Sequence, residues 1–213
     1  MSLSSSEEER KVTSLDAVFS GVGGQGVVVL SDIYCEAAIL EGFDVAKAEV
    51  HGMAQRGGSI VAYARIGDKV ESPLIETGKA DVLVGFEVLE TARALPMLKR
   101  RGDVVVNMKY IQPCLLGTNI KPKKEEELMQ ILREKARVHE VDGVGLAEKL
   151  GNMLVVNTIL LGALSALPEV PVKAESFKQA IAGRLKEKYI NMNLKAFQLG
   201  RDSVLQVKLN KDL

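Results

Sequence analysis

Residues 19–26 read FSGVGGQG, and this glycine-rich stretch restricts the fold more than any other part of the chain. The apolar segment that leads into it, Leu15 to Phe19, has the length of a short buried strand, and a helix-compatible segment follows it. Gly21, Gly23 and Gly26 have the spacing G-x-G-x-x-G, which at a strand-to-helix turn allows a tight bend and close approach to a ligand. The stretch therefore predicts an α/β fold that begins with a strand, a glycine turn and a helix.

The composition limits what this glycine loop could hold. Lys plus Arg and Asp plus Glu number 28 each among 213 residues, so the formal net charge is zero. A general nucleic-acid binder would carry a basic surplus, and a neutral chain opposes association with another protein only weakly. A helix that starts after the glycines points free N–H groups outward. The candidates are a nucleotide, another anion and another protein chain.

Cysteine and histidine are too few for the usual metal centres. Cys35 and Cys114 form no C-x-x-C pair, and we expect both to be reduced and packed. An iron–sulfur cluster takes about four thiolates, and His51 and His139 are the only histidines. We therefore expect this chain alone to hold no metal and no cluster.

The sequence reads as one domain after a short lead-in. Residues 1–12 are mostly polar, and we expect them to be disordered and not a signal peptide. Residues 13–213 are enough for one sizeable core, and we expect a single domain there. The longest apolar run, Met153 to Leu167, is shorter than the roughly 20 residues that span a bilayer. We expect a cytoplasmic protein with no membrane segment.

Apolar periodicity predicts the order of strands and helices. The expected strands lie at 16–20, 44–50, 59–66, 81–86, 103–107 and 138–141, with a short antiparallel return at 69–72. The expected helices lie at 25–41, 89–98 (interrupted near Pro96), 125–135, 152–167, 176–188 (capped by Ser176) and 191–201, and a short helix that ends at Leu150 follows Gly143-Val144-Gly145. This order predicts a single three-layer α/β/α domain with a mostly parallel, Rossmann-like sheet and a helical C-terminal third. No helix separates the second and third strands, so we also expect an antiparallel element.

A second glycine-rich loop follows the second strand. Residues 51–58 read HGMAQRGG and are too long for a tight hairpin turn. If the first two strands run in the same direction, both loops lie at one edge of the sheet, where open α/β sheets bind ligands. Arg56 could bind a carboxylate or phosphate, and His51 could relay a proton. The structural alternative is a turn held by its own hydrogen bonds, and we favour recognition over catalysis.

The glycine loop is open to two interpretations. A dinucleotide site would use the three spaced glycines and an acidic residue at the end of the second strand, where Glu49 stands. Against this, Gly24 and Gln25 are not required by the dinucleotide fingerprint, and the second loop lies where adenosine would need room. The other interpretation is that the glycines allow close packing with a neighbouring chain. The residues alone favour neither.

The apolar segment 152–167 must be buried on nearly all sides. It is either a central core helix, which we favour, or a helix covered by a partner subunit. The chain has no nucleophile elbow (G-x-S-x-G) and no Walker A motif, because no Lys-Ser/Thr follows the glycine loop. The sequence therefore offers an anion-friendly sheet edge without a recognisable catalytic constellation.

Together the two loops resemble the gamma domain of the 2-oxoacid:ferredoxin oxidoreductases. Residues 21–26 (GVGGQG) followed by residues 49–59 (EVHGMAQRGGS) carry the resemblance, which extends from about Ala17 to Arg201. The HGMAQRGG version is similar to the indolepyruvate type, in which this domain is the beta subunit. Either loop alone is a moderate signal, but both loops in this order and at this separation are specific to the superfamily.

The resemblance implies a role within a larger enzyme. In this family the holoenzyme decarboxylates a 2-oxo acid on thiamine diphosphate, passes electrons through iron–sulfur clusters to ferredoxin, and forms an acyl-CoA. In the indolepyruvate type, the thiamine and cluster sites belong to the larger alpha subunit. The resemblance thus implies a subunit that is inactive alone, binds no cofactor itself and contacts the alpha subunit and, through the complex, ferredoxin. Whether the isolated chain forms a homodimer is left open.

The family pattern also implies which residues matter. The matching positions are Gly23, Gly24, Gln25 and Gly26 in the glycine loop and His51, Gln55, Arg56, Gly57 and Gly58 in the second loop. We expect these residues and Glu49 to face the catalytic subunit and to close the site where the 2-oxo acid or coenzyme A binds. No catalytic residue is assigned to this chain. The competing functions are a free-standing NAD- or FAD-binding oxidoreductase and a ligand-free protein–protein packing module.

Overall fold

The computed structural model describes residues 14–52, 57–113 and 121–211, with side chains up to residue 206. The expected lead-in, residues 1–12, lies outside these ranges. So do Gln55 and Arg56 of the second loop, and Cys114.

The described residues form one six-stranded mixed sheet. Its strands are β1 (Leu15–Val22), β2 (Asp44–His51), β3 (Ser59–Gly67), β4 (Ala80–Gly85), β5 (Leu98–Asn107) and β6 (Arg137–Val141). The strand order is β2-β3-β1-β4-β5-β6. β1, β4, β5 and β6 are parallel, whereas β3 is antiparallel to both β1 and β2. The predicted mostly parallel sheet with an antiparallel element is confirmed.

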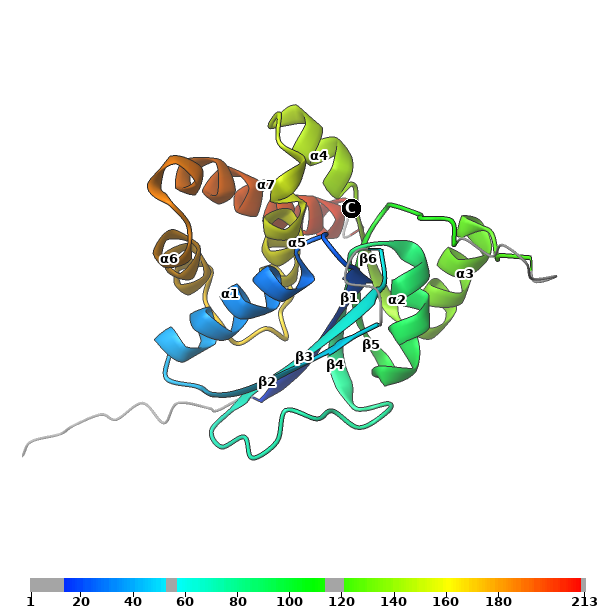
Figure 1. Ribbon diagram of the computed structural model, residues 1–213, viewed down its shortest axis with the longest axis horizontal. Coiled ribbons are helices and arrows are strands. Elements are labelled where there is room, and N and C mark those ends of the chain that lie inside the picture. Colours follow the sequence, from blue (N-terminus) through cyan, green and yellow to red (C-terminus); the bar gives the residue numbers. More distant parts are fainter. Residues whose placement is uncertain (1–13, 53–56, 114–120, 212–213) are drawn as a thin grey trace, which may run out of the picture.

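Helices cover both faces of the sheet. They are α1 (Val27–Leu40), α2 (Val88–Ala94), α3 (Glu125–Lys135), α4 (Gly143–Lys149), α5 (Val156–Ser165), α6 (Ala174–Arg184) and α7 (Glu187–Lys211), with 3-10 turns at Leu95–Met97 and Met153–Val155. Figure 1 shows α2 and α3 on one face and α1 with the C-terminal helices on the other. A separate apolar core fills each side of the sheet. The three layers and the helical C-terminal third are therefore as predicted.

Most of the apolar segment 152–167 is the core helix α5, whose close neighbour belongs to the same chain. The expected burial is wrong for its start, because Met153 and Leu154 in the preceding 3-10 turn are 49% and 81% exposed. α5 packs against α1, α4, α7 and β5, with α7 covering most of it. The crossing of α5 and α7 is tight because both helices have a glycine there. A Cβ on Gly162 would lie 2.0 Å from the carbonyl oxygen of Phe197, and one on Gly200 would lie 1.9 Å from that of Ile159. The described elements of this chain therefore bury α5 without a partner subunit.

Three further local predictions are wrong. Residues 69–72 form no strand, because β1 and β2 already occupy both edges of β3 and leave none for a returning strand. Ser176 does not cap α6, which begins earlier, at Ala174, after Lys173 in an extended conformation. The last helix also runs beyond its predicted end, from Glu187 to Lys211. Periodicity finds such elements, but it does not place their ends.

Candidate functional site

The two glycine-rich loops meet at one edge of the sheet. β1 and β2 run in the same direction, because both are antiparallel to the intervening β3. The backbone N–H of Gly23 donates to the carbonyl oxygen of Gly58 at 2.9 Å, and Gly57 N donates to Gly23 O at 3.5 Å. Within the second loop, Gly52 N donates to Ser59 O at 2.9 Å. The loops therefore form one surface, which we call the two-loop edge (residues 22–26, 51–52 and 57–59).

Gln25 shapes the glycine loop from inside the chain. Its side-chain oxygen accepts a hydrogen bond from Val22 N at 2.7 Å, while its own N–H donates to Val22 O at 3.1 Å. Gly26 starts α1 with a left-handed φ of 91° and packs against the side chain of Asn157. No described side chain caps α1, so its N-terminal N–H groups keep their positive potential. The Gly-Gly-Gln-Gly version of the loop thus has a structural reason.

Two exposed points of the two-loop edge are glycine backbone. Gly24 and Gly57 are exposed and have left-handed φ angles of 98° and 78°, and a Cβ on either would meet no atom of the described residues within 4 Å. Glycine is favoured there by φ alone, since no described residue fills the space. Such bare, prominent backbone lets another molecule approach closely.

Buried polar groups on α2 form hydrogen bonds beneath the two-loop edge. Glu90, on α2, accepts from the Ser59 hydroxyl at 2.5 Å and pairs with Arg93 at 2.5 Å. This contact ties the end of the second loop to the opposite helical layer. Glu87 caps the same helix, because its carboxylate accepts hydrogen bonds from the backbone N–H groups of Leu89 and Glu90. Burial raises the pKa of Glu87, although these backbone hydrogen bonds act in the opposite direction.

A similar polar link lies under the next strands. Asn107, at the end of β5, donates to Phe86 O at 3.0 Å and accepts from Gly143 N at 3.1 Å. It thereby joins the ends of β4 and β5 to the start of α4. These amide contacts are buried. The carboxyl edge of the sheet is consequently held by hydrogen bonds over its whole central part.

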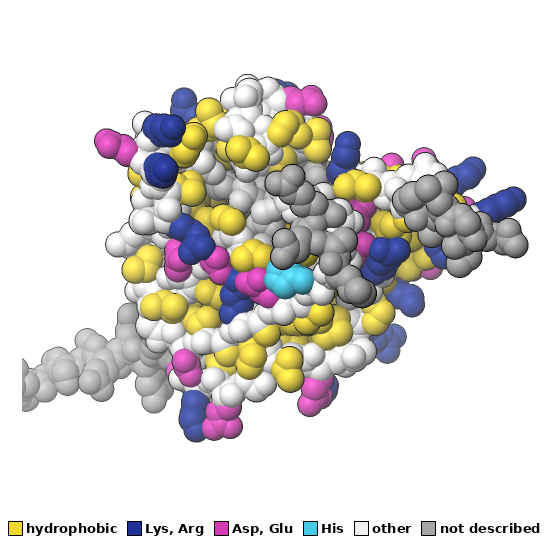
Figure 2. Space-filling view, viewed as in Figure 1, with side chains coloured by type: hydrophobic (Ala, Val, Ile, Leu, Met, Phe, Trp, Pro, Cys, Tyr) yellow, Lys and Arg dark blue, Asp and Glu magenta, His cyan; other side chains and the backbone are white. Residues whose placement is uncertain are grey.

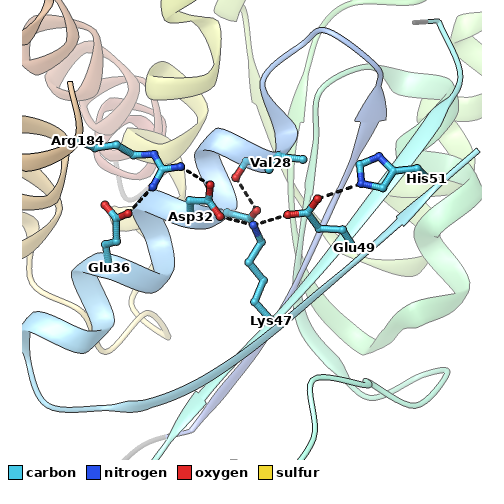
Figure 3. Close-up of polar contacts among 8 residues, drawn as sticks. Val28, Asp32, Glu36, Lys47, Glu49, His51 and Arg184 are labelled. Atoms are coloured by element: carbon cyan, nitrogen blue, oxygen red, sulfur yellow. Dashed lines mark hydrogen bonds and ion pairs between the residues drawn. The ribbon is translucent and has the colours of Figure 1, made fainter. Parts of the chain in front are cut away.

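A chain of ion pairs supports His51 at the end of β2 (Figure 3). Lys47 lies between Asp32 of α1 and Glu49, whose carboxylate is 2.6 Å from Lys47 Nζ. Glu49 also lies 3.0 Å from His51 Nε2. At the far end, Arg184 of α6 pairs with Asp32 and Glu36 of α1. Figure 2 shows this face with acidic and basic side chains next to one another.

The charges in this series of ion pairs determine which ring nitrogen of His51 carries a hydrogen. Hydrogen bonds from Lys47, and then from His51, hold the pKa of Glu49 below its ordinary value. Burial opposes the charge of Lys47, but its two carboxylate partners outweigh burial and raise its pKa. Glu49 is therefore an ionised acceptor, and Nε2 of His51 carries the hydrogen that it accepts. The Nδ1 atom is left for another partner, and the ring is about half exposed.

This arrangement does not match a dinucleotide site. The fingerprint places its acidic residue on the strand next to β1, but β3 separates β2, with Glu49, from β1. The N–H of Gly23 is already bonded to Gly58, and Glu49 is bonded to Lys47 and His51. One backbone donor of the glycine loop and the acidic side chain that would bind ribose therefore have partners within the chain.

The described residues do not fit an iron–sulfur cluster or another metal. In that part of the chain no three His, Cys, Asp or Glu side chains group as ligands. Burial raises the pKa of the Cys35 thiol to about 12, so it is not a thiolate near neutral pH. No described helix is long and apolar enough to cross a membrane.

The structure adds residues to the site that sequence reasoning did not assign to it. These are Asn157 beside Gly26, Glu90 beneath Ser59, and Asn107 at the end of β5. Asn107 had a visible signal, because a polar residue directly after a Val-rich strand marks a carboxyl end. The Ser59–Glu90 contact joins residues far apart in the chain and had none. Gln55 and Arg56, which were predicted for recognition, lie outside the described residues.

Comparisons with known proteins agree with one another. The family model described as pyruvate ferredoxin/flavodoxin oxidoreductase matches residues 16–203. The indolepyruvate oxidoreductase subunit IorB of Pyrococcus horikoshii is 37% identical over 186 residues, which cover 86% of this chain and 92% of that protein. A pyruvate/ketoisovalerate oxidoreductase common subunit gamma of Thermococcus litoralis is 32% identical, covering 84% and 94%. The gamma subunit of a keto/oxoacid ferredoxin oxidoreductase from Geobacter sulfurreducens superposes with a TM-score of 0.70 at 25% identity, covering 90% and 99%.

Proposed function

Because the chain belongs to the pyruvate ferredoxin/flavodoxin oxidoreductase family, we propose that it is the gamma-type subunit of a complex that oxidatively decarboxylates a 2-oxo acid. The products are an acyl-CoA, carbon dioxide and reduced ferredoxin. The two-loop edge carries this proposal, because it is a preformed surface that exposes glycine backbone at Gly24 and Gly57. On this proposal the isolated chain is inactive and the complex is cytoplasmic.

The partner is a larger alpha subunit that holds thiamine diphosphate and the iron–sulfur clusters. When bound there, these groups supply the decarboxylation and the electron transfer. This chain would cover the site from outside: the backbone of Gly24 and Gly57 would contact the partner, and the free N–H groups of α1 would face an anionic group of the 2-oxo acid or coenzyme A. His51, held by Glu49, would present Nδ1 to the same site.

Indolepyruvate is the substrate that the relatives favour. A relative named for indolepyruvate is 37% identical, whereas one named for pyruvate and ketoisovalerate is 32% identical. We therefore expect the complex to turn over indolepyruvate with a higher kcat/KM than pyruvate.

Four glycines allow a sharp test of the docking surface. Gly24, Gly57, Gly78 and Gly151 all have a left-handed φ and open space where a Cβ would stand. Asn tolerates that backbone conformation better than most residues, so each Gly→Asn variant should fold. Gly24 and Gly57 lie on the two-loop edge; Gly78 precedes β4 at the amino edge and serves as the matched control.

The experiment co-expresses each variant with the large subunit and measures complex yield and turnover. Gly24→Asn and Gly57→Asn should each lower assembly or kcat/KM at least about tenfold, because a new side chain blocks close approach of the partner. Gly78→Asn should match the wild type, and thermal unfolding of the isolated chains should separate misfolding from lost docking. If both loop variants behave like Gly78→Asn, the proposed surface is wrong.

A further inference from the structure

The opposite, amino edge of the sheet carries a hollow lined by cations. It has a volume of about 480 Å³ and lies between the bulged start of β5, the 3-10 turn before it and the end of α3. Lys99, Arg100, Arg101 and Lys135 line it, with Glu134 as the acidic residue. The volume is within the range of small-ligand sites.

Two of these five charged side chains, both arginines, have no partner or helix-end role within the described chain. Lys99 pairs with Asp81, and Glu134 accepts from Gln130 at 2.9 Å. Arg100 and Arg101 are exposed and have no ion pair or side-chain hydrogen bond with any described residue. Lys135 is in the last turn of α3, where a cation offsets the negative end of the helix dipole. The surplus positive charge therefore comes from the two arginines.

The backbone that presents the arginines is irregular. Ala80 pairs with Leu98 and Val82 with Asp103, so residues 99–102 lie opposite Asp81 alone and bulge out of the sheet. Arg101 has a φ of 59°, the one left-handed φ outside glycine in the described chain. Bulges re-aim side chains, and a non-glycine residue held in this conformation points to a functional constraint. A glycine at this position would be easier to accommodate, yet the sequence has arginine.

We propose that this hollow binds a small molecule that carries two or more phosphate groups. Paired guanidinium groups suit phosphate because each can donate two parallel hydrogen bonds to its oxygens. The site lies at the edge opposite the two-loop edge, so a ligand there would leave the partner-facing surface free. The proposal does not depend on the assignment to the oxidoreductase complex.

The test titrates the isolated full-length chain with inorganic pyrophosphate by calorimetry at low ionic strength. We expect saturable binding with a Kd of roughly 1 mM or tighter, weakening as salt is added. Arg100→Ala combined with Arg101→Gly should weaken binding at least about tenfold. Lys195→Ala, which removes an exposed cation from α7, should leave binding unchanged.

Arg101→Gly alone separates a binding role from a structural one. It removes a cation and at the same time relieves the left-handed backbone. Weaker pyrophosphate binding with an equal or higher Tm supports the proposal. Pyrophosphate affinity that is the same in the wild type and in both arginine variants, or no saturable binding, would overturn it.

Discussion

The carboxyl and amino edges of the sheet differ in how their polar groups are paired. At the carboxyl edge, polar groups are paired within the chain: Gly23 with Gly58, Ser59 with Glu90, and Asn107 with Gly143. What faces outward there is glycine backbone and the half-exposed ring of His51. At the amino edge, β5 bulges and presents Arg100 and Arg101 without partners among the described residues.

The difference indicates two kinds of recognition. A surface whose two loops are already hydrogen-bonded to each other and which exposes glycine backbone suits close contact with a protein of complementary shape. A hollow with surplus charge on long side chains suits a small anion, whose charge and geometry the arginines can follow. Substitutions that disturb one edge and spare the other can test this contrast.

The largest expected effect is from Gly85→Ala at the end of β4. A Cβ there would lie 1.6 Å from Thr91 Oγ1, and this hydroxyl donates to Glu87 O at 2.6 Å. Overpacking at this buried position should cost about 3 kcal/mol or more of unfolding free energy, and lower the Tm by roughly 6–12 °C. Gly183→Ala, where α6 has open space, should be neutral or stabilising. Equal Tm values for the two variants would contradict a tightly packed carboxyl edge.

An intermediate effect is expected from Asp103→Asn near the amino edge. Burial alone would raise the pKa of Asp103, but hydrogen bonds from His139 and Arg137 outweigh it and lower the pKa. Because the pKa of Asp103 is lower in the folded protein, its carboxylate stabilises the fold at pH values above its unfolded pKa of about 3.9. This contribution is lost as the pH falls through the folded-state pKa.

Denaturant unfolding at several pH values checks this second prediction. Near pH 7 the Asp103→Asn variant should lose about 2 kcal/mol, because Arg137 and His139 lose their shared anion. The difference from the wild type should shrink below about pH 4. Glu175→Gln, which removes an exposed partner of Lys178, serves as the control and should change stability by less than about 0.5 kcal/mol. A pH-independent gap would show that the carboxylate charge is not the cause.

The smallest effect on stability is expected from Glu49→Gln beside the two-loop edge. The Lys47–Glu49–His51 contacts are partly exposed, so their loss should cost the isolated chain only about 0.5–1 kcal/mol. Because the pKa of Glu49 is lowered, this contribution should be present near neutral pH and disappear as the pH falls below about 4. Denaturant unfolding of both proteins at pH 7 and at pH 3 measures it. A loss above about 2 kcal/mol would mean that the network supports the fold and not only His51.

Most of the layers were predictable from the sequence, but the strand order was not. Alternating residues at 59–66 predict a strand, yet they do not say that it pairs with β1 as well as β2. That choice depends on contacts between distant segments. It also explains the wrong prediction at 69–72, because both edges of β3 are already paired and a returning strand finds no free edge.

The sequence predicted the loops of the candidate site, but it did not predict the contacts between distant residues that hold them. Glycines and polar residues that follow apolar strands located both loops and their shared edge. The bond between Ser59 and Glu90 could not be foreseen, because α2 reaches Ser59 only through the order of the strands. The bulge at 99–102 was also missed, since a short run of cations before a glycine reads as an ordinary turn.

Hydrogen–deuterium exchange on the assembled complex tests the central claim most directly. The backbone amides of residues 21–30 and 57–61 should exchange more slowly when the large subunit is bound than in the isolated chain. The amides of residues 98–103, at the amino edge, should exchange at the same rate in both. Protection confined to 98–103, with 21–30 and 57–61 unchanged, would show that the two-loop edge does not face the partner.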